Sequence, residues 1–413
     1  MHIFTRALFK RMTLAAAAAL VLTAHTPVHA QSVAFEGARL IVGDGRVVEN
    51  GVLVIEGARI TYAGAAQGAK IPAGATRENV AGKTIMPTLI DTHTHLSQDT
   101  AALTRDLKQR AYYGVSAALS MGQDTADAPF QIRANVPAGA ARFFTAGRGI
   151  TMPEPGRTTA PIWVKDEAEA RAAVRTNAAK KVDIIKIWVD DRDGSVMKMP
   201  PAVYAAVIDE AHKAGIRVTA HIFNLEDAKG LLRAGIDAFA HGVRDKDVDA
   251  EFIAMLKTYP NLVLNPNMAG RGAVADIAWL KSSQAPEDYA KIEKGNINDP
   301  KAQAVHGIQA RNLAKMNAAG VKIILGTDGN TSYAPHFEME DMVLAGMTPA
   351  QVIAASTKNA AEFLKMADAG TLEAGKSADL LILDANPLDN ITNTRRISRV
   401  YLRGAAIDRS KLP

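Results

Sequence analysis

The sequence contains no cysteine. This absence excludes a thiolate nucleophile, an iron–sulfur cluster and a zinc site with thiolate ligands. Disulfide bonds are excluded as well, but a chain of 413 residues can bury a stable core without them. Any metal in this protein must therefore be held by histidine, by carboxylates or by a modified lysine.

Long hydrophobic runs and a strong charge of one sign are also lacking. No segment beyond the N-terminus has the roughly 20 unbroken apolar residues of a membrane helix. The formal net charge is +5, and the first 30 residues supply three of the basic groups, so the rest of the chain is nearly neutral. We therefore expect neither a membrane protein nor a nucleic-acid partner, and a homo-oligomer is compatible with this composition.

The N-terminus has the order of a secretory signal peptide. It begins with three basic residues, Arg6, Lys10 and Arg11. An apolar run over residues 14–23 follows, and small residues precede a cleavage site after Ala30. This pattern predicts a signal peptide over residues 1–30 and a periplasmic or secreted mature protein, and the alternative is a buried N-terminal helix.

Both ends of the mature chain are rich in β-branched residues and turn signals. Gly43-Asp44-Gly45 and Glu56-Gly57 separate short apolar runs, as in antiparallel hairpins. Residues 378–384 and 399–404 are also short apolar runs typical of β-strands. We predict a composite β-sandwich domain built from residues 31–82 and 369–413.

Residues 83–368 alternate short apolar runs with amphipathic stretches. Eight runs are candidate strands: Thr84–Leu89, Ser116–Ser120, Arg142–Ala146, Ile184–Val189, Arg217–Ala220, Ala238–Ala240, Leu262–Asn265 and Lys322–Leu325. Helices are expected between them, for example over Asp166–Lys180, Pro201–Ala214 and Leu225–Ala234. This alternation predicts an α/β fold with a (β/α)₈ TIM barrel, and the polar segment Gly270–Ala302 is expected to be a loop at its mouth.

Chemically distinctive residues stand at the carboxyl ends of these strands. They are His93, His95, Lys186, His221, His241 and Asp328. The carboxyl ends of barrel strands form one rim, where active sites of this fold lie. Four of the seven histidines beyond residue 30 fall on this rim, and with Lys186 and Asp328 they are enough for two metal ions. Zinc suits imidazole and oxygen ligands, and cobalt, manganese and nickel are alternatives.

Each residue also has a simpler interpretation. The histidines are then solvated or structural, and Asp328 forms a turn. Lys186 lies among isoleucines and Trp188, so an ammonium there is costly to bury unless an acid such as Asp190 pairs with it. The other interpretation of Lys186 is a lysine of lowered pKa that carbon dioxide has carboxylated.

The set His93-Thr94-His95, Lys186, His221, His241 and Asp328, in this order, resembles the amidohydrolase superfamily. The resemblance is to its binuclear form with a carboxylated lysine, in the branch that is imidazolonepropionase-like and Xaa-Pro dipeptidase-like. Residues 370–384 are similar to the closing sheet motif of that family.

The resemblance implies a metal-dependent hydrolase that cleaves a C–N bond in an amide, a dipeptide or a carbamate. It implies that His93, His95 and Asp328 hold one metal and that His221 and His241 hold the other. N6-carboxylated Lys186 and a hydroxide would bridge them, with Asp328 as general base and acid.

The substrate pocket is less defined by the sequence. Candidates for substrate contacts are Arg148, Trp188, Asn267, Tyr333 and His336. The two other functions consistent with the pattern are lactone or ester hydrolysis on the same dimetal centre and a barrel without catalytic activity. Asn224 stands where related deaminases have a glutamate, so deamination is not expected.

The signal peptide leads to the first testable prediction. N-terminal sequencing of the protein recovered from the periplasm of a Gram-negative host should begin at or near Gln31, because the export peptidase reads the small residues before it. An intact Met1 on soluble, active protein would contradict the prediction.

Overall fold

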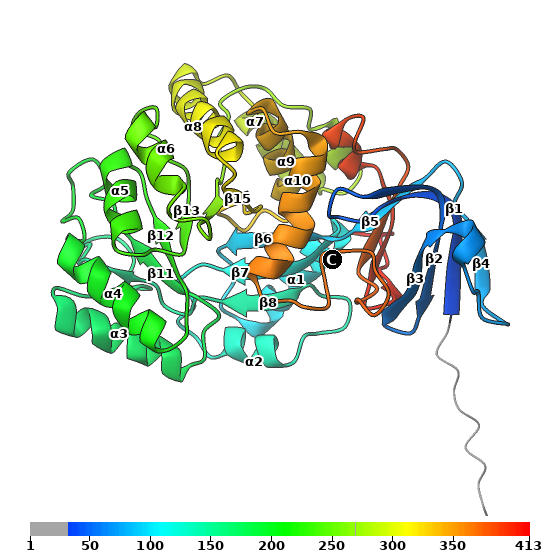
Figure 1. Cartoon of the computed structure of the whole chain (residues 1–413), viewed down its shortest axis with the longest axis horizontal. Coiled ribbons are helices and arrows are strands. Elements are labelled where there is room, and N and C mark those ends of the chain that lie inside the picture. The colour runs from blue at the N-terminus through cyan, green and yellow to red at the C-terminus, as the bar shows by residue number, and fades with distance from the viewer. Residues whose placement is uncertain (1–31, 269) are drawn as a thin grey trace, which may run out of the picture. The chain divides into compact units, whose positions relative to one another are not determined.

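The structure is a computed structural model that describes residues 32–268 and 270–413. The predicted signal peptide lies outside the described residues. The chain from Gln31 to Pro413 forms one compact unit with α-helices and two kinds of sheet (Figure 1). Among the described residues, no helix has both the length and the apolar character needed to cross a membrane.

Eight strands of the middle region run parallel to their neighbours. They are β6 (Leu89–Thr94), β7 (Val115–Ser120), β8 (Arg142–Thr145), β11 (Ile185–Trp188), β12 (Val218–His221), β13 (Ala238–Ala240), β14 (Val263–Asn265) and β15 (Lys322–Ile323). Two short strands, β9 (Ile150–Thr151) and β10 (Ile162–Trp163), belong to the connection after β8. The eight strands follow each other in chain order around the sheet, as in a (β/α)₈ barrel.

Strands β6 to β8 form one parallel sheet and strands β11 to β15 belong to another. Backbone hydrogen bonds at both junctions join the two sheets into a ring. The Asp183 amide donates to the Thr145 carbonyl at 2.9 Å, which places β8 beside β11. The Thr92 amide donates to the Leu325 carbonyl at 2.9 Å, which places the end of β15 beside β6. The parallel sheet therefore fits the barrel that the sequence predicts.

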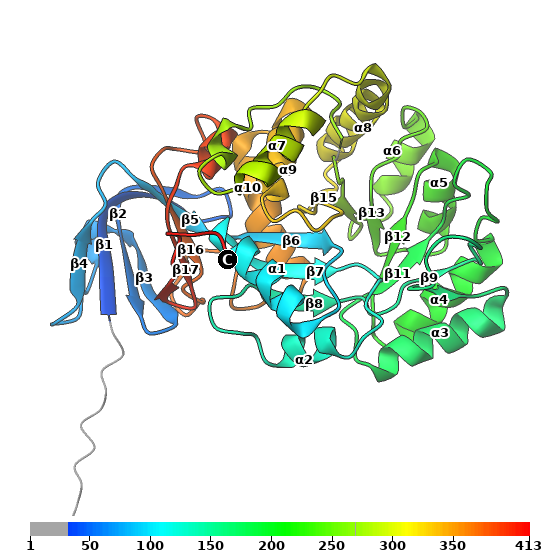
Figure 2. The ribbon, with the colours of Figure 1, turned by 180° about the vertical axis from the view of Figure 1, so that it is seen from behind.

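Helices follow the barrel strands along the chain. They are α1 (Thr100–Tyr112), α2 (Ala128–Ala134), α3 (Glu167–Ala179), α4 (Pro201–Lys213), α5 (Leu225–Arg233), α6 (Ala250–Leu256), α8 (Pro300–Ala318), α9 (Ala334–Leu344), α10 (Pro349–Ala354), a π-helical segment (Ala355–Asn359) and α11 (Ala360–Phe363). Helices α3 to α6 lie outside strands β11 to β13 in both views (Figures 1 and 2). Asp166 caps α3 by accepting a hydrogen bond from the Glu169 amide at 2.9 Å. The predicted helices over 166–180, 201–214 and 225–234 are confirmed as α3, α4 and α5.

The two ends of the described chain share one sheet. Its strands are β1 (Ser32–Ile41), β2 (Val47–Glu56), β3 (Arg59–Ala65), β4 (Thr76–Asn79), β5 (Thr84–Pro87), β16 (Leu380–Leu383), β17 (Ile397–Leu402) and β18 (Ala405–Ala406). The blue and red strands consequently lie side by side (Figure 2). The union of both ends is thus observed, but as a single sheet of eight strands, and a separate β-sandwich is not confirmed.

The boundary between this sheet and the barrel differs from the prediction. We expected Thr84–Leu89 to be the first barrel strand, but Thr84–Pro87 is β5, which pairs with β1 and β16. The barrel strand is β6, and it continues through His93 to Thr94. The run from 84 to 94 is buried throughout, so its hydrophobicity gave no sign of the change of sheet at Thr88.

The polar segment Gly270–Ala302, which we expected to be a lid or substrate loop with a short helix, does contain helical turns. It contains a 3₁₀ turn at Ala278–Leu280 and the short helix α7 (Pro286–Gly295). Two further 3₁₀ turns lie in the end segments, at Ala66–Gly68 and Ile391–Arg395.

One arginine of the barrel binds the segment that leads into the end sheet. Arg142, in β8, donates to Asp368 at 2.8 Å, to Ser377 at 3.1 Å and to Asp379 at 3.3 Å. The Asp379 side chain is only 3% exposed, and its oxygens accept from the Arg142 guanidinium at 3.3 Å and from the Arg403 amide at 2.6 Å.

Arg142→Ala should lower the free energy of unfolding by roughly 3 kcal/mol, because it leaves a buried carboxylate without its cation. Urea denaturation of the variant would measure the loss. Arg77→Ala is the control, since Arg77 pairs with Glu36 on the surface and such pairs contribute little. Equal effects of the two variants would contradict this role for Arg142.

Candidate metal centre

Four of the predicted ligands converge at the carboxyl end of the barrel. The Asp328 Oδ1 atom lies 3.1 Å from His93 Nε2 and 2.9 Å from His95 Nε2, and Asp328 Oδ2 lies 3.7 Å from His241 Nε2. The His241 ring is also 4.4 Å from the His221 ring, centroid to centroid. His93, His241 and Asp328 offer ligand atoms within 4.8 Å of one another, as a shared metal ion would need.

The position of Asp328 follows from the closure of the barrel. The Asp328 amide donates to the His93 carbonyl at 2.8 Å, and Asp328 has a positive φ of 53° that turns its side chain back over β6. Gly326 makes this approach feasible, because a Cβ there would lie 2.7 Å from the His93 Cβ and 2.1 Å from Asn265 Nδ2. The sequence Gly-Thr-Asp thus serves close packing as well as the turn.

The hydrogen bonds of His93 indicate which ring nitrogen is free. His93 Nδ1 lies 3.0 Å from the amide oxygen of Asn267, which can only accept, so Nδ1 carries the proton. Burial lowers the pKa of His93 to about 4, and the charge of Asp328 opposes this only in part, so the ring is neutral at neutral pH. The Nε2 lone pair of His93 therefore faces the Asp328 carboxylate, and two acceptors face each other.

Asp328 itself is charged. Burial raises its pKa, whereas positive charge on the rings of His93, His95 and His241 lowers the pKa of Asp328 well below its usual range, so the carboxylate needs positive charge at these rings. A carboxylate that faces neutral imidazole nitrogens lacks a cation, and a divalent metal ion supplies one.

Lys186 is fully buried and its amino group has no partner among the described residues. Burial lowers the pKa of Lys186 to about 7, which the charge of Asp328 offsets only in part. The Nζ atom lies 5.2 Å from the centre of the Trp188 ring. The alternative that Lys186 pairs with Asp190 is not met, because Asp190 binds other residues.

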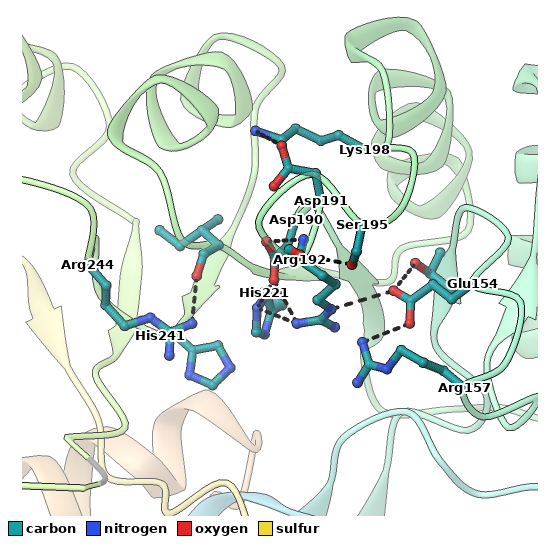
Figure 3. A network of polar contacts seen from close by, with 12 residues as sticks. Glu154, Arg157, Asp190, Asp191, Arg192, Ser195, Lys198, His221, His241 and Arg244 are labelled. Atoms are coloured by element: carbon teal, nitrogen blue, oxygen red, sulfur yellow. Dashed lines mark hydrogen bonds and ion pairs between the residues drawn. The ribbon is translucent and has the colours of Figure 1, made fainter. Parts of the chain in front are cut away.

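Asp190 instead holds His221. Its Oδ2 atom lies 3.2 Å from His221 Nε2 and accepts from the Arg192 guanidinium at 2.7 Å (Figure 3). Burial favours a higher pKa for Asp190, but these two partners keep its pKa below the usual range. A carboxylate on one ring nitrogen fixes the tautomer and leaves the other nitrogen of His221 for a ligand, as is common around metal-binding histidines.

The residues present therefore fit a metal centre. The donors are imidazoles and carboxylate oxygens, the set that zinc and related ions prefer. A buried polar atom without a hydrogen bond also lies here, since Nζ of Lys186 has no hydrogen-bond partner in the described chain. Such atoms are costly inside a protein unless a ligand satisfies them.

The predicted substrate contacts are placed less favourably. The Arg148 guanidinium donates to the carbonyls of Thr159, Ala160 and Pro161 at 2.7–3.0 Å, so it fastens its own loop. His336 is fully buried, with its ring nitrogens 2.9 Å from the Tyr113 carbonyl and 3.0 Å from the Thr394 hydroxyl. Both residues have protein partners throughout, and we do not carry them into the proposed substrate site.

The other three predicted substrate contacts, Asn267, Trp188 and Tyr333, each lie in a different environment. Asn267 orients His93, as described above. Trp188 is buried against Gly122 and Gly149, where it covers Lys186. Tyr333 belongs to an aromatic cluster and lines a cavity of about 630 Å³ whose walls include none of the six predicted ligands.

Two arginines near the centre were not predicted from the sequence. Arg192 contacts His221 Nε2 at 3.3 Å, and Arg244 follows His241 in the loop after β13 (Figure 3). The only sequence signal for Arg192 and Arg244 was that they follow β11 and β13 closely, on the rim where the predicted ligands lie.

Comparison with known proteins agrees with this geometry. The pattern of the amidohydrolase family matches residues 84–407. The chain is 26% identical over 390 residues to an imidazolonepropionase of Shouchella clausii, covering 86% of this chain and 84% of that one. It is also 26% identical over 419 residues to an ochratoxinase of Aspergillus niger, covering 85% and 81%.

A solved structure has the same fold. A Xaa-Pro dipeptidase superposes with a TM-score of 0.74 at 22% identity, covering 91% of this chain and 99% of that one. With a family match that spans most of the chain, this protein belongs to the amidohydrolase family and is a hydrolase that acts on C–N bonds.

Proposed function

We propose that this protein is a dimetal amidohydrolase that cleaves an amide, peptide or carbamate bond in a small molecule. His93, His95 and Asp328 would hold one divalent ion, and His221 and His241 the other. Lys186, carboxylated on Nζ, would bridge them. Zinc is the favoured metal, because the set is rich in imidazole.

The observation that carries the proposal is the meeting of His93 and Asp328. A neutral imidazole whose Nδ1 proton is held by Asn267 points its lone pair at a carboxylate 3.1 Å away. Neither group has a proton to share, so the contact needs a cation. Proteins of this family bind divalent metals, and the relatives named imidazolonepropionase and Xaa-Pro dipeptidase support C–N cleavage as the reaction.

The environment of Lys186 supports its carboxylation. Attack on carbon dioxide requires the neutral amine, and full burial favours that form. Trp188 and the isoleucines beside Lys186 offer no acid to hold an ammonium. A carbamate anion would receive its counter-charge from the cations at the site.

Divalent ions bound at such a site supply a water of lowered pKa and polarise the substrate carbonyl. The protein's own contribution is proton transfer by Asp328, whose carboxylate lies among the proposed ligand histidines and is placed to accept a proton from the attacking water. Water adds to the carbonyl carbon, the C–N bond breaks, and Asp328 returns the proton to the leaving nitrogen. The products are an acid and an amine from an amide, or an amine, carbon dioxide and an alcohol from a carbamate ester.

Metal content tests the ligand set. Elemental analysis of the purified protein should find close to two divalent ions per chain, and a chelator should abolish hydrolysis of amide substrates. His93→Ala and His241→Ala should each lose metal and reduce the rate by several orders of magnitude, because each removes a ligand. His212→Ala is the control, since His212 lies on α4 and pairs with Asp237. Full activity of metal-free protein would refute the proposal.

Lys186 allows a test of the carbamate. Lys186→Ala should bind less metal and lose nearly all activity, and added acetate or propionate should restore part of both by filling the space with a carboxylate. Lys186→Arg should remain inactive, because a guanidinium stays charged and cannot be carboxylated.

Whether Lys186 is carboxylated is tested by measuring the turnover and the metal content of both variants, with and without added acid and zinc. If Lys186→Arg keeps two metals and wild-type activity, Lys186 is not carboxylated.

A further inference from the structure

Arg244 is a guanidinium with few partners in a largely buried place. It lies three residues after His241, in the loop that follows β13. One terminal nitrogen donates to the Ile222 carbonyl at 3.1 Å, and the guanidinium carbon lies 5.1 Å from the centre of the Phe223 ring. The Nε atom is buried and has no hydrogen-bond partner in the described chain.

No carboxylate of the described chain forms a direct ion pair with this guanidinium. Among the described residues, no acidic oxygen lies within the 4.0 Å of an ion pair with Arg244, although acids pair with most of the arginines around the barrel. Its neighbour Arg192 is balanced by Asp190 at 2.7 Å and approaches Glu154 at 3.7 Å. Asp328 and Asp190 favour the charge of Arg244 from a longer distance, but no anion contacts the guanidinium directly, and its free donors can take a ligand of negative charge.

Arg244 is also close to the proposed metal ligands. Figure 3 shows its side chain running from the β13 loop toward the ring of His241. Arg244 also lies in the same loop as His241, at the carboxyl end of β13. A group bound to Arg244 would therefore lie beside the bond to be cleaved.

We propose that Arg244 binds a carboxylate of the substrate, so that the enzyme acts on amides that carry a free carboxylate, such as N-acyl amino acids or dipeptides. The inference rests on the proposed function. A guanidinium has paired donors that match the two oxygens of a carboxylate, and Arg244 has donors to spare. The sequence analysis named Arg148 as a candidate substrate contact, but the Arg148 guanidinium binds carbonyls of its own loop, whereas Arg244 keeps donors without a partner.

Hippurate and its neutral amide, hippuramide, test the charge alone, because they differ only in the carboxylate. Calorimetry on the mature, zinc-loaded protein should show hippurate binding at least ~10-fold more tightly than hippuramide. Arg244→Met should abolish this preference and leave hippuramide binding unchanged, and Arg244→Lys should retain part of it. Arg157→Met is the matched control, since it removes an exposed guanidinium paired with Glu154, and it should keep the preference.

The same titration on chelator-treated protein separates this inference from the proposed function. A preference for hippurate that persists without metal and depends on Arg244 supports the carboxylate site even if no amide is hydrolysed after zinc is restored, in which case only the proposed function fails. Equal binding of the two probes by the wild type, or an unchanged preference in Arg244→Met, would overturn the inference while leaving amide hydrolysis open.

Discussion

The contact between the end of β15 and the end of β6 is the constraint on which the site depends. Through the bonds from Thr92 to Leu325 and from Asp328 to His93, it closes the barrel and lays Asp328 over the histidines. The chain separates these residues by more than two hundred positions, and only the closed ring makes them neighbours. A barrel that failed to close here would keep every ligand in its sequence and lose the centre.

Burial gives these ligands their chemistry. It lowers the pKa of His93 to about 4 and that of Lys186 to about 7, and it leaves Nζ of Lys186 without a hydrogen-bond partner in the described chain. In an ordinary core such groups would be destabilising. Around divalent ions they become satisfied, and the same burial favours carboxylation of the lysine. Arg244 likewise has no direct anionic partner in the described chain, and the carboxylate of the proposed substrate would supply one.

The fold and the ligand set follow from local signals, and the rest depends on contacts between distant residues. Strand ends and His-x-His spacing are visible in a sequence because period-two alternation and polar residues after apolar runs are local features. The change of sheet at Thr88 left no such trace, since both sheets bury that run completely. The partners of Arg148, Asp190 and His336 could not be foreseen either, because loop carbonyls and distant side chains supply them.

A crystal structure of the zinc-loaded protein, with anomalous scattering recorded at the zinc edge, tests the central claim most directly. We expect two anomalous peaks, one between His93, His95 and Asp328 and one beside His221 and His241. Between them we expect density for a carboxylate attached to Nζ of Lys186. A single peak elsewhere, or an unmodified Lys186 beside empty histidines, would contradict the dimetal centre.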